Sequence, residues 1–386
     1  MSGRTRGLHI DAVALSLVAA IVLFGLIMVT SASISIASKE SGNAFLYLER
    51  QLVLCLTGFV LAAIVFCVRT EYLEKMAWPL LIVAVALLFF VLIPGLGHVV
   101  NGSRRWIRVL GFNFQASELA RVLTLIFIAS YAVRREDELR NSAIGLIKPM
   151  GLLVFVALLL LAEPDFGAAS VLFITGFGIL FIAGARLRYV LIAAAAGAGA
   201  MALLVMLVPY RMARVTSFLN PWADPFNSGF QLTQSLIAIG RGEWFGVGLG
   251  ESVQKLFYLP EAHTDFLFAV LAEELGLVGV VVTLGLFIAL VWRSFWIAQL
   301  ASRAGLKFQS YLALGFGLWL GAQALINIGV NMGVLPTKGL TLPFMSYGRS
   351  SLLVTLAWFG VVLRVHHEAI MAMRGSAPSR RRGGDE

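Results

Sequence analysis

Apolar residues are gathered in runs that recur along nearly the whole chain, with short polar segments between them. A helix needs about 20 residues to cross about 30 Å of hydrocarbon, and most of the runs approach or reach that length. The pattern predicts an all-α polytopic membrane protein with about ten transmembrane helices, over residues 12–34, 50–68, 76–95, 117–133, 145–162, 167–184, 188–208, 265–292, 309–332 and 348–366. No stretch is left for a soluble domain, so we expect residues 1–386 to form a single integral membrane domain.

Composition and charge agree with this class. Hydrophobic residues make up 59% of the chain and charged residues only 13%, whereas soluble proteins carry about 25% charged residues. The net charge of +9 could suggest a nucleic-acid partner, but the basic residues stand between the apolar runs and at the ends of the chain. They form no single patch, so we expect membrane lipids and no nucleic acid.

An even number of spans places both termini on one side of the membrane. Lys and Arg are in excess in the short segments on that side, and the positive-inside rule therefore predicts cytoplasmic termini. Residues 367–386, with a run of three arginines, are expected to be a basic cytoplasmic tail. The long segments 95–117, 208–264 and 333–349 then face outside, and 208–264 is the large outer loop.

The most informative outer stretch is 259–276, where a polar loop becomes an apolar helix. Asp265 would lie at or just below the membrane surface, where charge is costly. One interpretation is that its carboxylate favours the N-terminus of the following helix. The other is a general base that takes a proton from an attacking hydroxyl. His263 is a candidate partner of Asp265, and Glu261 a supporting or merely solvated residue.

Further carboxylates are expected in supporting roles. Glu273 and Glu274 lie about 12 to 14 Å farther along the same helix, so they need partners or a water-filled cavity. A structural hydrogen bond to another helix explains them equally well. Asp165 follows a proline in a tight outer turn, where a structural role is favoured. Glu118 is a candidate ion-pair partner.

Cations on the outer face are not explained by the positive-inside rule. Arginine binds phosphate through two hydrogen bonds and lysine acts as a point charge, which makes a diphosphate the natural ligand. Ion pairs with Glu118, Glu163 or Asp165 are the alternative. The cations concerned are Arg104, Arg105, Arg108, Arg121, Lys338 and Arg349.

Two other kinds of site have weaker signals. The glycine-rich run 240–250 lacks the Gly-Lys-Ser or Gly-Lys-Thr ending of a P-loop, so backbone turns explain it better. No His/Cys cluster has the spacing of metal ligands, and no cofactor is evident. A divalent cation between a carboxylate and a diphosphate stays open, because such ions use oxygen ligands that leave no motif.

Motifs on several separate loops, in one order, resemble the SEDS family of bacterial cell-wall synthesis. The resemblance spans all the expected helices and is closer to the division branch than to the elongation branch. It rests on Asn-Gly-Ser-Arg-Arg-Trp-Ile at 101–107, Gln-Ala-Ser-Glu-Leu-Ala at 115–120, Glu-Pro-Asp-Phe-Gly at 163–167, the stretch 259–276, Pro-Thr-Lys-Gly at 336–339 and Ser-Tyr-Gly at 346–348.

The resemblance implies a peptidoglycan glycosyltransferase of septal wall synthesis, in the cytoplasmic (inner) membrane of a bacterium. It would polymerise lipid II on the outer face and release undecaprenyl diphosphate, with a class B penicillin-binding protein and other division proteins as partners. The essential loop aspartate of the family matches Asp265, and its important basic positions match Arg105 and Lys338. Arg104 and Ser346 are added as candidate substrate-binding residues.

The chain departs from the family pattern at two positions. Ala116 stands where proline is frequent, which we expect to alter only a helix start. Arg349 stands where glycine is usual, which raises a question about the backbone of the last outer loop.

Two other function classes use the same residues. A lipid II flippase would use the cations together with Glu273 or Glu274 in a cavity, and a non-catalytic scaffold would only hold division proteins. Charge concentrated at the outer face favours the enzyme, whereas a polar path through both faces favours the flippase.

Overall fold

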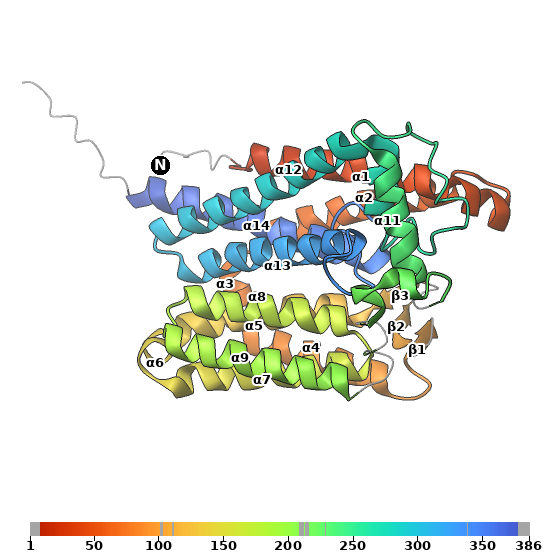
Figure 1. Cartoon of the computed structure of the whole chain (residues 1–386). Coiled ribbons are helices and arrows are strands. Elements are labelled where there is room, and N and C mark those ends of the chain that lie inside the picture. The colour runs from red at the N-terminus through yellow and green to blue at the C-terminus, as the bar shows by residue number, and fades with distance from the viewer. Residues whose placement is uncertain are drawn as a thin grey trace, which may run out of the picture.

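The computed structural model describes residues 8–100, 103–109, 112–207, 212, 216–227, 229–337 and 339–376. Seven helices in these residues are long and apolar enough to cross a membrane, and three shorter apolar helices accompany them. The expected ten spans are thereby accounted for. They run side by side, with a small sheet and α11 (Phe230–Gly242) at one end of the bundle (Figure 1). We call that the loop end.

The helices follow the predicted spans, with some longer boundaries. In chain order they are α1 (Ala12–Ser41), α2 (Leu46–Cys67), α3 (Thr70–Lys75), α4 (Ala77–Leu92), α5 (Ala116–Arg134), α6 (Glu136–Asn141), α7 (Ala143–Ala162), α8 (Phe166–Ile182), α9 (Leu187–Met206), the 3-10 turn η1 (Pro221–Ala223), α11, α12 (Leu267–Arg303), α13 (Lys307–Asn331) and α14 (Arg349–Ser376).

The first transmembrane helix begins, and the last one ends, on the same side of the bundle, as the even number of spans predicts. The amide of His9 donates to Nδ1 of His367 at 3.2 Å, and Arg293 of α12 forms an ion pair with Asp11 at 2.9 Å. The start of α1 and the end of α14 are thus at the same end of the molecule. The predicted tail begins too early, because α14 continues to Ser376; residues 377–386 lie outside the described part.

The first outer loop contains a small sheet that the pattern of apolar runs does not predict. Strands β1 (His98–Val100), β2 (Ser103–Val109) and β3 (Phe112–Gln115) form an antiparallel sheet in that order. The antiparallel pairing satisfies backbone polar groups of this segment locally. β3 leads directly into α5, which places the arginines of β2 beside the start of that helix.

α5 is the central helix, and most of its side chains are buried. It contacts α4, α8, α13 and α14. The large outer loop contains a second unpredicted element, α11, which packs on α12 and α13. Leu232, Ser235 and Ala238 form part of its buried face, and Ser235 donates from its hydroxyl to the carbonyl of Asn331 at 2.8 Å.

α12 is interrupted at Gly276, where φ is +62° and ψ is −160°. A Cβ at this position would lie 2.4 Å from the backbone nitrogen of Gly246 and 2.6 Å from the carbonyl oxygen of Gly242. Only glycine accepts both this backbone conformation and this close approach. The break separates a short first segment, which follows Asp265, from the long remainder of the helix.

We expect Gly276→Ala to lower the free energy of unfolding by at least about 1–3 kcal/mol, because it adds backbone strain and a steric clash. The measurement is the thermal midpoint of the purified protein in detergent. Gly285→Ala is the matched control in the same helix, since nothing lies within 4 Å of its Cβ position. That change should be neutral or stabilise by up to about 1 kcal/mol. Equal midpoints for the two variants would contradict the break as a structural requirement.

Candidate functional site

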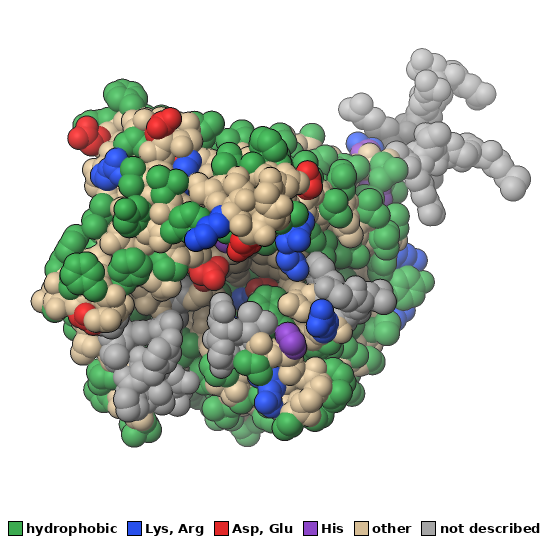
Figure 2. Space-filling view, turned by 90° about the vertical axis from the view of Figure 1, so that its right-hand side faces the viewer, with side chains coloured by type: hydrophobic (Ala, Val, Ile, Leu, Met, Phe, Trp, Pro, Cys, Tyr) green, Lys and Arg blue, Asp and Glu red, His purple; other side chains and the backbone are tan. Residues whose placement is uncertain are grey.

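The candidate site lies at the loop end, which Figure 2 shows face on. A hollow near the middle of this face is surrounded by acidic and basic side chains. Asp265 is half-buried and directly precedes Phe266, the residue that caps α12. The sequence prediction that Asp265 stands at a helix start is therefore confirmed.

Two asparagines of α13 hold the backbone of Asp265. Asn327 donates to its carbonyl oxygen at 2.9 Å and Asn331 at 3.1 Å. The first-turn amide of Ala269 donates to Oδ1 of Asn331 at 3.2 Å. This donor, which an N-terminal carboxylate could have satisfied, is therefore bound by Asn331.

The last outer loop lies against the carboxylate. A Cβ on Gly339 would stand 3.1 Å from Oδ2 of Asp265, so the loop backbone passes very close to this oxygen. Asn327 also donates to the carbonyl of Leu340 at 2.5 Å, which joins the loop to the same asparagine that holds Asp265. Lys338, the predicted phosphate-binding lysine, lies outside the described residues.

His263 joins the two loops, and Ser346 has a structural contact within the last one. The amide of Tyr347 donates to the carbonyl of His263 at 3.0 Å, and the histidine ring packs against Tyr47 and Tyr347. Burial lowers the pKa of His263 below its ordinary value. Ser346 is buried, and its hydroxyl accepts from the amide of Leu342 at 3.0 Å. A contact of Ser346 with substrate stays a prediction.

Glu261 is exposed and has a positive φ of 58°. Its carboxylate accepts from the hydroxyl of Thr264 at 2.6 Å, and its carbonyl accepts from the amides of Thr264 and Phe266. These contacts shape the turn that leads into Asp265.

The arginines of β2 point in different directions. Successive side chains of a strand lie on opposite faces. Arg104 is half-buried and donates to the carbonyl of Leu92 at 3.4 Å. Arg105 is close enough to Glu163 to oppose the rise in the pKa of that carboxyl. The structure thus places Arg105 toward the turn between α7 and α8, and Arg104 toward α4. Arg108 is exposed.

Asp165 and Glu118 are both buried and both have partners. Asp165 caps α8 through the amide of Ala168 at 3.0 Å and accepts from the hydroxyl of Ser117 at 2.9 Å. Glu118 forms an ion pair with Arg121 one turn later in α5, and Arg121 reaches Gln323 of α13. Of the two interpretations of Arg121, phosphate binding or an ion pair with a carboxylate, the structure shows the ion pair.

Arg349 occupies the first position of α14, outside the left-handed backbone region. Its Nε donates to the hydroxyl of Tyr347 at 3.2 Å. The arginine is therefore accommodated without a backbone conformation that only glycine would adopt, and the question raised by this departure is answered. Ala116, the other departure, is the first residue of α5.

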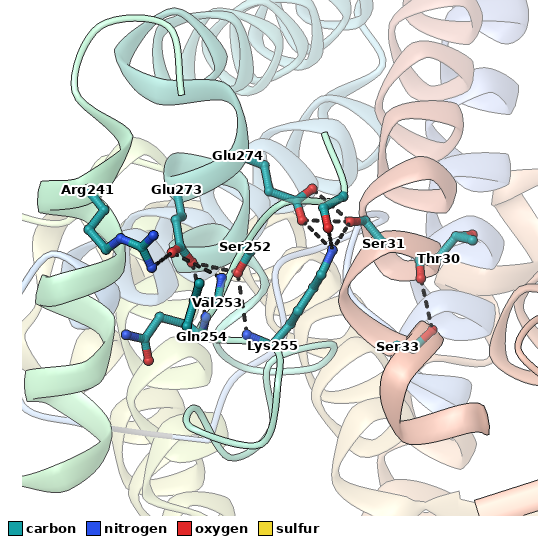
Figure 3. A network of polar contacts seen from close by, with 11 residues as sticks. Thr30, Ser31, Ser33, Arg241, Ser252, Val253, Gln254, Lys255, Glu273 and Glu274 are labelled. Atoms are coloured by element: carbon teal, nitrogen blue, oxygen red, sulfur yellow. Dashed lines mark hydrogen bonds and ion pairs between the residues drawn. The ribbon is translucent and has the colours of Figure 1, made fainter. Parts of the chain in front are cut away.

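Glu273 and Glu274 are completely buried and have separate sets of partners (Figure 3). Glu273 forms an ion pair with Arg241 at 2.9 Å, and Glu274 with Lys255 at 2.8 Å. The expected partners of these carboxylates therefore exist, but the sequence did not identify the two cations. Both cations lie in the large outer loop, and the spacing along the chain gives no signal for the pairing.

The polar residues of α13 that contact the site could have been found from the sequence. Gln323, Asn327 and Asn331 recur every four residues in an apolar span, which places all three amides on one face of the helix. Among the described residues, no group of three or more His, Cys, Asp or Glu side chains is arranged to hold a metal ion. The divalent cation stays a prediction.

The sequence suggests Glu163 only as a possible ion-pair partner, and in the structure its carboxyl oxygens have no hydrogen-bond partner among the described residues. Burial, and secondly the charge of Asp165, raise its pKa to about 9. When the pKa of an acid is higher in the folded than in the unfolded state, its contribution to stability is fully present at pH values below the unfolded-state pKa. That contribution is lost as the pH rises toward 9.

We therefore expect Glu163→Gln, which cannot ionise, to become progressively more stable than the parent protein between about pH 5 and pH 9. Thermal midpoints at pH 5, 7 and 9 measure this. The exposed Glu251 provides the control variant, Glu251→Gln. A difference between Glu163→Gln and the parent that is independent of pH would contradict the buried, neutral carboxyl.

Solved structures with the same architecture exist at substantial sequence identity. One is a chain of the structure described as "Structural coordination of polymerization and crosslinking by a peptidoglycan synthase complex". It is 34% identical, has a TM-score of 0.73, and the match covers 94% of this chain and 99% of that one. The rod shape determining protein RodA of Thermus thermophilus is 32% identical, with a TM-score of 0.66 and coverage of 94% and 98%.

Curated relatives are more similar in sequence. The probable peptidoglycan glycosyltransferase FtsW of Thioalkalivibrio sulfidiphilus is 54% identical over 92% of this chain and 88% of its own length. The protein of the same name in Nitrosococcus halophilus is 53% identical over 91% of both chains. A family model described as cell cycle protein, for FtsW, RodA and SpoVE, matches residues 11–370. The motif resemblance is thus confirmed, and the chain belongs to the FtsW/RodA/SpoVE family of cell cycle proteins.

Proposed function

We propose that this protein is a peptidoglycan glycosyltransferase that polymerises lipid II into glycan strands at the outer face of the cytoplasmic membrane during cell division. The observation that carries the proposal is the group of relatives named FtsW, which are about half identical over more than 90% of this chain. The membrane-spanning helices fit a lipid-linked substrate, because such a substrate reaches the enzyme within the bilayer.

The reaction requires a base and a cationic site. The C4 hydroxyl of an acceptor GlcNAc attacks the anomeric carbon of a donor MurNAc with inversion, and the bond to undecaprenyl diphosphate breaks. The hydroxyl proton passes to a base, and negative charge develops on the leaving diphosphate. We assign Asp265 as the base.

The position of Asp265 supports that role. The carboxylate is half-buried at the loop end, where two asparagines hold its backbone and the last outer loop passes beside it. A base must be held accurately to accept a proton in the transition state. The two backbone contacts supply such positioning.

The leaving diphosphate is assigned to Arg105 and Lys338, with Arg104 and Ser346 as further candidates. The direction of Arg105, toward the turn that holds Glu163 and Asp165, supports a site between β2 and that turn. Arg104 points toward α4, which favours Arg105 as the nearer ligand of the two.

The partner is proposed to be a class B penicillin-binding protein, whose transpeptidase crosslinks the strands. The similarity to a chain of a peptidoglycan synthase complex supports a partner of this kind. The excess of basic residues supports cytoplasmic termini, so that the loop end and Asp265 face outside.

We expect Asp265→Asn to reduce polymerisation of labelled lipid II by about 10²–10⁴-fold, the usual contribution of a general base. The assay is a gel of glycan chains made by the purified protein with its partner. The amide is nearly isosteric with the carboxylate, and the hydrogen bonds of Asn327 and Asn331 to the backbone are retained.

Glu261→Gln is the control for this experiment, because Glu261 is an exposed carboxylate in the same turn. It should retain most of the activity. Polymerisation by Asp265→Asn at the parent rate would show that another group is the base. If the parent protein makes no glycan but moves lipid II across proteoliposome membranes, the protein is a flippase.

A further inference from the structure

The glycine-rich run in the large outer loop forms backbone hydrogen bonds with α12 at the point where this helix is interrupted. At the break, carbonyls before Gly276 and amides after it lose their partners within the helix. The segment 243–248 supplies replacements. Val247 and Gly248 donate to the carbonyls of Glu273 and Glu274 at 3.0 and 3.1 Å, while Leu277 and Val278 donate to the carbonyls of Glu243 and Trp244 at 2.9 and 3.2 Å.

The side chains of the same two glutamates hold the next part of the loop. Besides its ion pair with Arg241, Glu273 accepts from the hydroxyl of Ser252 at 2.5 Å and from the amides of Val253 and Gln254 at 3.3 and 3.4 Å. Residues 252–254 are therefore attached to α12 through one carboxylate.

Lys255 is the last of these attachments along the chain, and it is buried. Its side chain is 7% exposed and that of Glu274 is 0% exposed. The ammonium group contacts Glu274 at 2.8 Å, the hydroxyl of Ser31 at 3.0 Å and the carbonyl of Gly250 at 2.6 Å. The hydroxyl of Ser31 also donates to Glu274 at 2.7 Å. Three separate segments, α1, the loop and α12, thus meet at one buried ion pair (Figure 3).

This ion pair begins the stretch that ends at Asp265. The stretch is held at its other end by Asn327 and Asn331, and close to that end the amide of Tyr347 donates to the carbonyl of His263. Lys255 and Glu274 thus fix the first end of the segment 255–265, whose second end carries the proposed base.

We propose that Lys255 and Glu274 are positioning residues for glycosyl transfer, acting through the path of residues 256–264 to set the place of Asp265. The proposal rests on the proposed function of Asp265. A displacement of about 1 Å in a reacting group can cost about 10²-fold in rate, so loosening the anchor should reduce kcat. It should leave the KM for lipid II nearly unchanged, because neither side chain is exposed to a substrate.

Single substitutions at this pair would leave an unpaired buried charge and could prevent folding. The double variant Lys255→Met/Glu274→Gln removes both charges together and keeps the volumes similar. The charge exchange Lys255→Glu/Glu274→Lys restores an ion pair in the opposite sense. Ser31→Ala is a milder change that leaves the ion pair in place.

The experiment compares these variants in the lipid II polymerisation assay, with the full-length protein and its partner. We expect kcat to fall about 10–100-fold in the double neutral variant with KM within about 3-fold of the parent. The charge exchange should recover part of kcat, and Ser31→Ala should lose several-fold. The control is Lys148→Met/Glu138→Gln, which removes a more exposed ion pair between α6 and α7. It should leave kcat unchanged.

Hydrogen exchange of the amides of residues 256–266 tests, independently of enzymatic activity, whether the ion pair of Lys255 and Glu274 holds this segment in place. We expect faster exchange in this segment in the double neutral variant and parent-like exchange in the control variant. A folded double neutral variant with parent kcat, or with a raised KM and unchanged kcat, overturns the proposal, and so does unchanged exchange. If the parent makes no glycan, the proposed function fails, and the exchange data still decide whether the ion pair anchors the segment.

Discussion

Inside a membrane, a helix that breaks must find new partners for the backbone groups that the break releases, because no water is present to bind them. The interruption of α12 at Gly276 places this constraint on the whole loop end. The large outer loop folds back so that residues 243–248 satisfy the released groups. The glycine-rich composition of the run follows from this, since Gly246, Gly248 and Gly250 all have positive φ.

The buried charges depend on the same arrangement. Glu273 and Glu274 directly precede the break, and each would be very costly alone in an apolar interior. Arg241 and Lys255 neutralise them from the loop, and hydroxyls and amides satisfy further carboxylate oxygens. The cost of burial is therefore offset only when the loop is in place. The loop and the first segment of α12 consequently form one structural unit.

A second set of polar contacts joins this unit to the last outer loop. Asn327 and Asn331 bind the backbone of Asp265, and Asn327 also binds Leu340. Segments more than 60 residues apart in the chain thus meet at α13. The backbone of the candidate base is held by these asparagines, and the segment that leads to it starts at the buried ion pair of Lys255 and Glu274. The carboxylate of Asp265 remains half-buried at the loop end.

The sequence by itself determined the class of the molecule, the approximate position of the spans, the common side of the two termini and the place of Asp265 at the start of a helix. These properties depend on local composition, because an apolar run of sufficient length must cross the bilayer as a helix. The motifs of separate loops also indicated the family, because their residues and their order are properties of the chain alone.

Only the tertiary structure decided which polar groups meet. The sheet of strands β1, β2 and β3 and helix α11 were missed because the segments are short and their pairing or packing partners cannot be read from an apolar-run pattern. The partners of Glu273 and Glu274 come from a loop and from α1, at separations in the chain of 19 to 243 residues. Such contacts leave no local periodicity. They form because each buried charge or released backbone group must be satisfied, and the fold alone determines which partner is near enough to do so.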